Sequence, residues 1–281
     1  MYILAAVKNC EKHLPQIFCN IDSLRTIYPD LHCIFIYDHC SDKTGTILME
    51  YAAKHKPNIY VEELFDNNSK LRTERIAYAR NRCLTIFYER QINSDYFIFI
   101  DADNVNENPW NVNKMKEIME KNQIENTWDC LSFNRDPYYD IWALLLLNHS
   151  HHCWGFGVQS PKIVRYLKEY MKLKLQICEE EMIEVHSAFN GLAIYKKEKF
   201  TNCVYSGNID VFMKEEFFTK EEIIKTLHYY RKQLKNEFIF IQPLRTTFLD
   251  PKEICEHLYF HLMAKKKNHA RIYISKSSIF L

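Results

Sequence analysis

Residues 96–103 read YFIFIDAD. The first five are apolar or aromatic, a pattern typical of a strand that is buried on both faces of a parallel sheet. The run ends in two carboxylates, Asp101 and Asp103. Because side chains alternate along an extended chain, both carboxylates are expected on the same side of the strand end. Like charges this close raise the pKa of one group, unless a cation or a hydrogen-bond network keeps both ionised.

The carboxyl edge of a parallel sheet is also where open α/β folds bind their ligands. A hard divalent cation, Mg²⁺ or Mn²⁺, suits two carboxylates there because it prefers oxygen ligands and keeps positions open for substrate phosphates. A strand followed by an Asp-rich turn, continued by Asn104, explains the same residues without any ligand. The Asp-x-Asp pattern alone leaves both interpretations open.

The composition is that of a folded protein without a strong charge bias. The chain has 281 residues, of which 47% are hydrophobic, and its 37 basic residues nearly balance 36 acidic ones. There is therefore no global electrostatic reason to expect a nucleic-acid partner. The ten cysteines include no C-x-x-C pair, which indicates reduced thiols and a cytoplasmic location. No apolar run is long enough for a signal or membrane segment, so we expect no membrane span.

Strand and helix patterns alternate through residue 100, which predicts an α/β fold with a doubly wound sheet. The expected strands of this half are 3–7, 31–37, 59–63 and 96–100, and the expected helices are 11–28, 46–55 and 73–91. The second half is less regular. Its expected helices are 110–122, 160–175, 215–235 and 255–267, and its expected strands are 129–134, 187–195, 238–242 and 271–274.

We find no internal repeat and no low-complexity linker, so one domain over residues 1–281 is the simplest description. Residues 1–105 are expected to bind a nucleotide, and residues 106–281 are expected to shape an acceptor pocket. In the second part, Asn190 and Gly191 interrupt the strand 187–195, which indicates a close approach of the backbone to a ligand.

Asp38 stands at the carboxyl end of the strand 31–37, where a carboxylate can accept hydrogen bonds from a ribose or a base. A helix-capping turn, formed with Ser41 or Asp42, explains the same segment without a ligand. The sequence alone leaves both interpretations of Asp38 open.

The helix 73–91 begins among several arginines. A guanidinium group presents a planar fork of donors that suits phosphate oxygens. Helical spacing prevents all of these arginines from facing one ligand, and we select Arg75 and Arg80 as the pair that contacts it. An exposed helix face, with arginines paired to Glu74 and Glu89, accounts for one or two of the others.

Several motifs, in their order along the chain, resemble nucleotide-sugar glycosyltransferases of the GT-A fold. In the first hundred residues, which look like the family 2 enzymes, they are Ala5-x-Val7-Lys8-Asn9, the Asp38 turn, Ala79-Arg80-Asn81 and Asp101-Ala102-Asp103. Residues 72–81, 139–143 and 189–195 are closer to the capsule-associated mannosyltransferase-like group. The resemblance covers roughly residues 1–275.

This resemblance implies a GT-A doubly wound mixed sheet and a metal-dependent enzyme. The enzyme would move a sugar from a nucleoside diphosphate sugar (a UDP- or GDP-sugar) to a glycan or another hydroxyl acceptor, with Mn²⁺ or Mg²⁺ as cofactor. Asp103 would coordinate the metal, and Asp101 would hold the ribose or reach the metal through water. The other expected donor contacts are Ala5, Val7, Asp38, Arg75, Arg80, Ala102 and Gly191.

The resemblance also places a catalytic motif at Cys255-Glu256-His257. Family 2 enzymes have Glu-Asp at this place, with the second residue as base, and this chain has His257 there. His257 is therefore either a third metal ligand or a general base with a pKa near neutrality, and Glu256 is the base in the first case.

The remaining interpretations concern the acceptor side and the class of protein. Residues 138–142 offer aromatic faces for a sugar, with Asp140 for its hydroxyls, although Trp142 also suits a hydrophobic core. His149, His151, His152 and Cys153 lie too close together for ordinary zinc spacing and indicate a loop on the acceptor side. A nucleotidyltransferase acting on sugar phosphates, and a catalytically inactive carbohydrate-binding homologue, are the alternatives to a glycosyltransferase.

Overall fold

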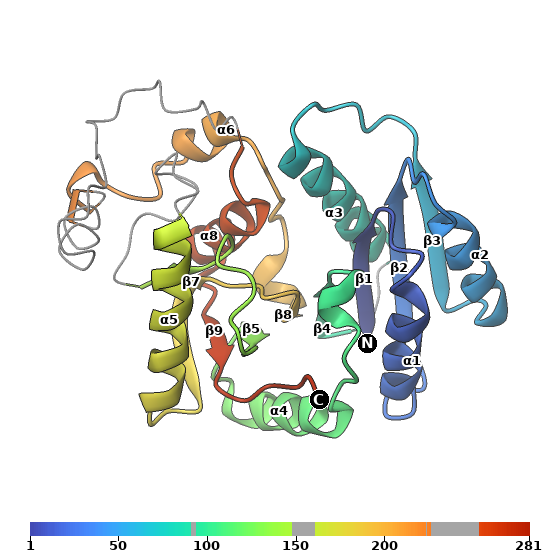
Figure 1. Ribbon diagram of the computed structural model, residues 1–281, viewed down its shortest axis with the longest axis horizontal. Helices are drawn as coiled ribbons and strands as arrows, with labels where there is room; N and C mark the ends of the chain where they lie inside the picture. Colours follow the sequence, from blue (N-terminus) through green and yellow to red (C-terminus); the bar gives the residue numbers. More distant parts are fainter. Residues whose placement is uncertain (91–93, 148–160, 223, 226–252) are drawn as a thin grey trace.

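A large mixed sheet organises the protein (Figure 1). The computed structural model describes residues 1–90, 94–147, 161–222, 224–225 and 253–281. The strands in these ranges form one sheet in the order β3-β2-β1-β4-β8-β5-β9-β7-β6. Helices cover both faces, so the predicted α/β class with a doubly wound mixed sheet is confirmed.

The first half of the chain builds the parallel part of the sheet, as the sequence predicts. Its strands are β1 (Tyr2–Val7), β2 (His32–Asp38), β3 (Ile59–Leu64) and β4 (Tyr96–Ile100). Its helices are α1 (Leu14–Arg25), α2 (Thr44–Lys54) and α3 (Arg72–Glu89). Successive strands carry apolar side chains on both faces, and each helix covers one face with its apolar stripe.

The second half adds the antiparallel part. The strands are β5 (Cys130–Phe133), β6 (Leu145–Leu146), β7 (Met182–Ser187), β8 (Leu192–Lys196) and β9 (Ile272–Ser275). The helices are α4 (Val112–Glu125), α5 (Pro161–Ile177), α6 (Ile209–Lys214) and α8 (Glu256–Asn268), with short 3₁₀ helices η1 (Asn104–Asn106) and η2 (Lys197–Phe200). Strand β8 lies between β4 and β5 and runs antiparallel to both, so β4 and β5 point the same way.

The interruption predicted at Asn190 and Gly191 in the strand 187–195 is confirmed, but the two parts belong to different strands of the sheet. Ser187 is the last residue of β7, and β8 begins at Leu192 in another part of the sheet. Asn190 and Gly191 make the break because both have positive φ angles, 57° and 87°. A Cβ atom on Gly191 would lie 2.4 Å from Cγ1 of Val105, so this position has no room for any side chain.

Three other predictions differ from the structure or lie outside it. Residues 215–219 are not helical, and within the described residues the helix starts only at Lys220. The rest of the expected helix to residue 235, the expected strand 238–242 and the group His149–Cys153 lie outside the described residues. Helix α6 was not predicted, although Asn208 caps it by accepting the backbone N–H groups of Asp210 and Val211.

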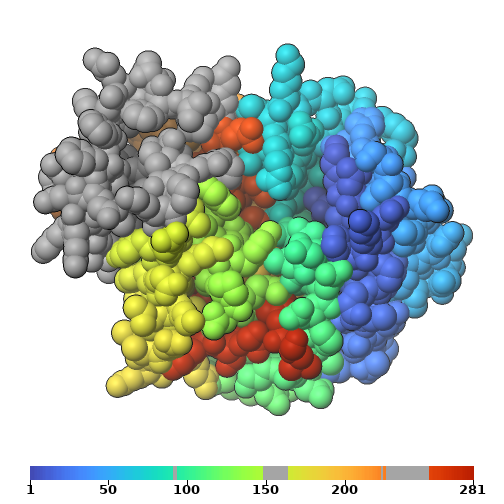
Figure 2. Space-filling model, in the orientation of Figure 1, coloured from blue at the N-terminus to red at the C-terminus, as the bar shows by residue number. Residues whose placement is uncertain are grey.

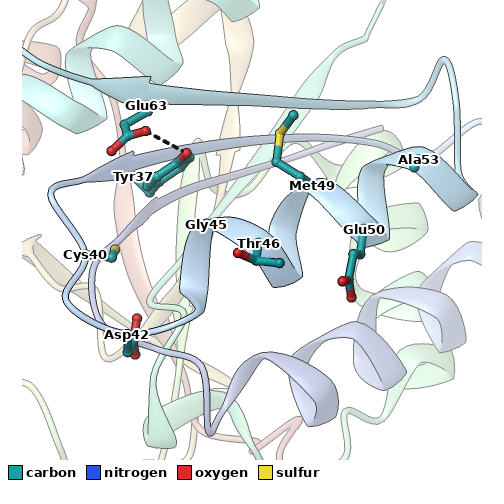
Figure 3. A pocket seen from close by; sticks show the side chains of 9 residues that line it. All are labelled: Tyr37, Cys40, Asp42, Gly45, Thr46, Met49, Glu50, Ala53 and Glu63. Carbon is teal, nitrogen blue, oxygen red and sulfur yellow. Dashed lines mark hydrogen bonds between the residues drawn. The ribbon is translucent and has the colours of Figure 1, made fainter.

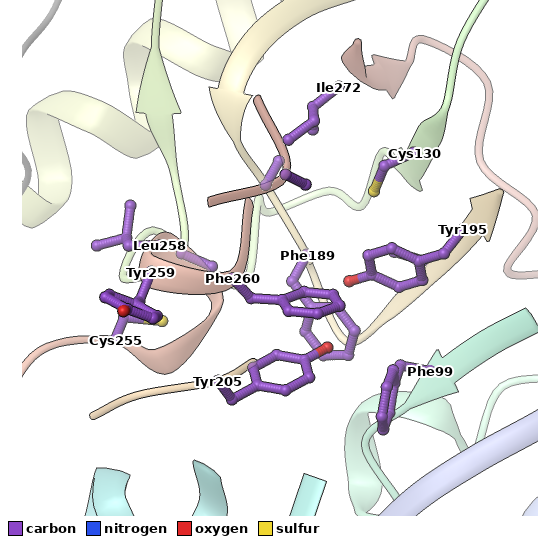
Figure 4. Packing of buried hydrophobic residues seen from close by; sticks show 14 of the residues in the cluster. Phe99, Cys130, Phe189, Tyr195, Tyr205, Cys255, Leu258, Tyr259, Phe260 and Ile272 are labelled. Atoms are coloured by element: carbon purple, nitrogen blue, oxygen red, sulfur yellow. The ribbon is translucent and has the colours of Figure 1, made fainter. Parts of the chain in front are cut away.

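Two hydrophobic layers enclose the sheet. Helices α1, α2 and α4 cover one face, and α3, α5 and α8 cover the other. The second layer is rich in aromatic rings from β8, α8 and the chain around residue 205 (Figure 4). Tyr205 and Phe260 stack there with ring centroids 4.0 Å apart. None of the helices in the described ranges is long and apolar enough to cross a membrane.

Candidate active site

The end of β4 holds the two carboxylates that the sequence singles out. The backbone N–H of Asp101 donates to the carbonyl of Gly191 at 2.8 Å, and the Asn106 side chain donates to the carbonyl of Asp101 at 2.8 Å. Asp103 caps η1, because its Oδ1 accepts the backbone N–H of Val105 at 3.1 Å. Both residues are thus fixed in place by backbone hydrogen bonds at the carboxyl edge of the sheet.

Arg80 on α3 links three elements beneath this edge. Its Nη2 donates to Oδ1 of Asp101 at 2.8 Å, and its Nε lies 3.6 Å from Oε1 of Glu256 on α8. Its Nη1 faces Nδ1 of His257 at 3.3 Å, and its Cζ lies 4.8 Å from the ring centroid of Phe189. Only 6% of Arg80 is exposed. The guanidinium group therefore faces protein groups on every side, whereas the sequence predicted that it would contact the nucleotide sugar.

Arg75 does not join Arg80. Its Nη1 donates to the carbonyls of Ser69 at 2.8 Å and Lys70 at 3.4 Å, and its own carbonyl accepts the side-chain amide of Asn67. Five residues of helix separate the two arginines by about 140° around the axis, so they point in different directions. Arg75 fixes the segment that leads into α3.

Asp38 at the end of β2 is buried, with 5% exposure. Its Oδ2 accepts hydrogen bonds from Asn67 at 3.2 Å and from Nζ of Lys8 at 3.3 Å. Its Oδ1 has no hydrogen-bond partner in the described part of the chain, and Nε2 of His39 lies 3.9 Å from it. A buried carboxylate oxygen without a donor is unfavourable, so this oxygen can accept a donor from a ligand.

Negative charge outweighs positive charge around Asp101. Burial raises the pKa of Asp101 to about 8, although Arg80 beside it acts in the opposite direction. Three further carboxylates add to the rise: Asp103, Asp140 and Glu256. Burial, with a contribution from Glu256, also raises the pKa of Asp140 to about 6. A cation placed among these groups would reverse both shifts.

The donor set at the end of β4 fits a divalent cation that is shared with a substrate. Among the described residues, no group of three or more His, Cys, Asp or Glu side chains is arranged to hold a metal ion. Mg²⁺ is usually held by one or two carboxylates together with substrate phosphates, rather than by a cage of protein ligands alone. Asp103 and Asp101 provide such a pair of carboxylates.

Helix α8 begins with the pair Glu256-His257, and the two side chains have different surroundings. Glu256 has 7% of its side chain exposed and makes no hydrogen bond within the described residues apart from its ion pair with Arg80. His257 is stacked on Phe189, with ring centroids 3.7 Å apart, and its Nε2 is buried without a partner in the described chain. Burial, with Arg80 and His261 nearby, holds the pKa of His257 well below its usual range, so the ring is neutral.

The structure does not bring His257 into contact with the Asp101–Asp103 pair. Its described contacts are with Arg80 and a set of rings, namely Phe189, Tyr205 and His261. One turn further along α8, His261 is fully buried. Its Nδ1 lies 2.8 Å from Oγ of Ser187, and its Nε2 lies 3.1 Å from the hydroxyl of Tyr195. Both histidines therefore lie in the aromatic layer below the edge of the sheet.

Three of the predicted donor contacts are core residues. The side chains of Ala5, Val7 and Ala102 are buried on the α1–α2 face of the sheet, whereas Asp101 points toward α3. A ligand at the edge can reach these three only through their backbone. Gly191 is positioned differently, because its carbonyl accepts both the backbone N–H of Asp101 and the side-chain amide of Asn106. Its place in the site is therefore to hold the end of β4.

One residue at the edge was not predicted from the sequence. Arg135 follows β5, and its Nε donates to the carbonyl of Asn190 at 3.2 Å. Asn190 in turn accepts the backbone N–H groups of Tyr139 and Asp140 through its side-chain oxygen, at 2.9 Å each. A signal for Arg135 was present, because it comes directly after an expected strand, and strand ends at this edge are where ligands bind.

An open hollow in the described chain lies elsewhere (Figure 3). It has a volume of about 640 Å³ and lies between α2 and the strands β2 and β3. Tyr37 lines it and donates a hydrogen bond to Glu63 at 3.0 Å. Alternation along β2 puts Tyr37 and Asp38 on opposite faces of the sheet. The hollow is therefore separate from the carboxylates of Asp38 and Asp101.

Comparisons with known proteins give only distant likenesses. No family model matches the sequence, and no curated protein matches it. Similar solved structures include TarS residues 1–349 from S. aureus, with 14% identity and a TM-score of 0.41, covering 82% of this chain and 54% of that one.

Two other similar structures come from other organisms. The mannosyltransferase PcManGT from Pyrobaculum calidifontis, in complex with GDP-Man and Mn²⁺, shares 15% identity with a TM-score of 0.41, covering 73% of this chain and 47% of that one. Glucosyl-3-phosphoglycerate synthase from M. tuberculosis shares 11% identity with a TM-score of 0.40, covering 72% of this chain and 58% of that one. The chain thus spans about half the length of these proteins. A likeness at this level establishes neither a family nor a substrate.

Proposed function

We propose that this protein is a metal-dependent glycosyltransferase of the GT-A type. It would move a sugar from a UDP- or GDP-sugar to a glycan or another hydroxyl acceptor. The observation that carries this proposal is the set of carboxylates at one edge of the sheet. Asp103 and Asp101 end β4, and Asp38, with its unpaired oxygen, ends β2 on the far side of β1. An elongated ligand that carries both phosphates and hydroxyls could contact the ends of β2 and β4 together.

Each group at the edge has a role in such a reaction. Asp38 accepts a hydrogen bond from the nucleoside through its free oxygen, and Asp103 with Asp101 holds Mn²⁺ or Mg²⁺. The cation, when bound, neutralises charge on the departing diphosphate. Gly191 and Asn106 fix the backbone of Asp101 and so hold the carboxylates in position.

Glu256 is the general base in this proposal. It lies in the first turn of α8, and its carboxylate belongs to the same group of charges as Asp101. His257 is enclosed by Phe189 and Arg80, which leaves no room for an acceptor hydroxyl at its buried Nε2. Glu256 therefore takes the proton from the acceptor, and His257 supports Arg80.

A screen of nucleotide sugars tests the proposed function. Purified protein is incubated with UDP- and GDP-sugars and Mn²⁺, and the released nucleoside diphosphate is measured. We expect release from at least one donor, and loss of that release when EDTA removes the metal. Release of pyrophosphate from a nucleoside triphosphate and a sugar phosphate would favour a nucleotidyltransferase. Absence of both activities, together with no binding of UDP or GDP, would count against an enzyme of either class.

Replacing Glu256 with glutamine is expected to cut sugar transfer by ~10²-fold or more while leaving nucleotide binding unchanged, because only proton removal is lost. Transfer rates and calorimetric binding of UDP or GDP with Mn²⁺ provide the measurement. Asp140→Asn is the matched comparison, since it changes a neighbouring carboxylate whose pKa burial raises to about 6. If Asp140→Asn loses transfer and Glu256→Gln keeps it, the base is Asp140.

A further inference from the structure

Arg135 is held in one orientation by three protein groups. Its Nε donates to the carbonyl of Asn190 at 3.2 Å, and its Nη2 donates to Oδ1 of Asn106 at 3.1 Å. Its Cζ lies 3.2 Å from the ring centroid of Phe280, so the guanidinium plane rests on that ring. These contacts remove most of the freedom of a long side chain.

The C-terminal residues that carry Phe280 are themselves tied to the protein. The carbonyl of Ile279 accepts the backbone N–H of Asn111 at 2.7 Å, and the N–H of Leu281 donates to the carbonyl of Pro109 at 2.9 Å. Phe280 forms an isolated bridge with Trp110. Figure 2 shows this segment, in red, on the surface beside the green residues of α4. The ring is therefore a fixed support for Arg135.

Arg135 lacks a counter-ion in spite of this close fixation. It forms no ion pair with any described residue, and its Nη1 makes no hydrogen bond with them. Burial lowers the pKa of Arg135 to about 10, because the charged guanidinium group has lost part of its hydration. Two other arginines of the fold have carboxylate partners, Arg80 with Asp101 and Arg82 with Glu62. A partly buried cation without an anion is unfavourable.

The carboxylates of Asp101 and Asp103 are close enough to act on Arg135, yet neither forms an ion pair with it. This edge thus carries an unpaired cation at the end of β5 and a surplus of carboxylates at the end of β4. A diphosphate with a bound divalent cation would satisfy both, because the carboxylates would hold the cation and the guanidinium fork would bind phosphate oxygens.

We infer that Arg135 binds the diphosphate of the donor, and that Phe280 and Asn190 position it for this contact. This inference rests on the proposed function and deepens it, because it assigns a residue to the leaving group. Arg135 then has the role that was predicted for Arg75 and Arg80, both of which form hydrogen bonds with protein groups.

The test is calorimetric titration of UDP and GDP, with Mn²⁺, into the intact protein and its variants. We expect Arg135→Gln to weaken binding by about 10- to 100-fold, the range of hydrogen bonds to charged groups. Arg135→Lys keeps the charge without the fork, so its affinity for the nucleotide should lie between those of the wild-type protein and Arg135→Gln. Phe280→Ala should weaken binding less than Arg135→Gln, and Phe280→Tyr, which keeps the ring, should restore it. The control is Arg165→Gln, which removes an exposed arginine from α5.

The outcomes separate the inference from the function on which it rests. If the wild-type protein binds UDP or GDP and Arg135→Gln binds it as well as Arg165→Gln does, Arg135 is not a donor contact, although the proposed function stands. If the wild-type protein binds neither nucleotide, the proposed function and the inference fall together. Thermal melting of each variant shows whether a loss of binding comes from unfolding, and Arg135→Lys decides the question if Arg135→Gln does not fold.

Discussion

Replacing Arg80 with methionine is expected to lower the free energy of unfolding by about 3–5 kcal/mol. The substitution provides an unbranched apolar side chain but leaves Asp101 and Glu256 without their shared cation in a mostly buried place. Removing one partner of a buried ion pair is strongly destabilising, because the remaining charge stays desolvated. Denaturant unfolding of the variant and the wild-type protein at about pH 9, above the pKa of about 8 that burial gives Asp101, measures the difference.

The matched control is Arg82→Met on the same helix. Arg82 pairs with Glu62 in a more exposed place, with 37% and 23% of the two side chains accessible, so we expect a loss of about 1 kcal/mol or less. Adding Glu256→Gln to Arg80→Met should recover part of the lost stability, since one of the two stranded charges is then gone. Equal losses for the two arginine variants would show that Arg80 is not the centre of a buried network.

Asp103→Asn is expected to remove metal-dependent binding of a nucleoside diphosphate and, with it, sugar transfer. Asp101 is already engaged by Arg80, so Asp103 is the carboxylate of the pair that is most available to a cation. Asparagine retains an oxygen that can accept the N–H of Val105, so the cap of η1 and the fold should remain. We expect the affinity for Mn²⁺ with UDP or GDP to fall by more than about 100-fold, beyond the effect of residues that only orient metal ligands.

Titrations of the nucleotide at several Mn²⁺ concentrations, with thermal melting alongside, test this expectation. Asp66→Asn serves as the control, because Asp66 is an exposed aspartate in the loop after β3. Metal-dependent binding that survives in Asp103→Asn at wild-type strength would contradict the assignment of Asp103 as a ligand.

The sequence predicted the parallel half of the sheet well, for a physical reason. Strands β1, β2 and β4 are buried on both faces, so each reads as a short apolar run that ends at a polar residue. The position of β8 was not predictable in this way. An apolar run shows that a strand is buried, but it does not show which strand lies beside it or in which direction it runs.

The site was predicted in part for a related reason. Asp101, Asp103 and Asp38 follow from strand ends, which are local features of the chain. The contact of Arg80 with Glu256 depends on the packing of α3 against α8, and a guanidinium group suits a carboxylate as well as a phosphate. Nothing near His257 in the sequence shows that Phe189 stacks on its ring. Arg135 belongs to no pattern of arginines, and only its position directly after an expected strand marks it in the sequence. Its contacts with Asn190 and Phe280 depend on distant parts of the chain.

The placement of β8 also bears on how the chain acquires its structure. During synthesis, β4 has no partner on one side until residues 192–196 have been made, so its edge is open to wrong pairing while about a third of the 281-residue sequence is added. Strand β5 then pairs with β9, which comes still later in the sequence. Contacts this distant in sequence slow folding, because a long loop must close before they form. Strand β4, which is followed by Asp101, is therefore enclosed only after β8 has been made, and β5 only after β9.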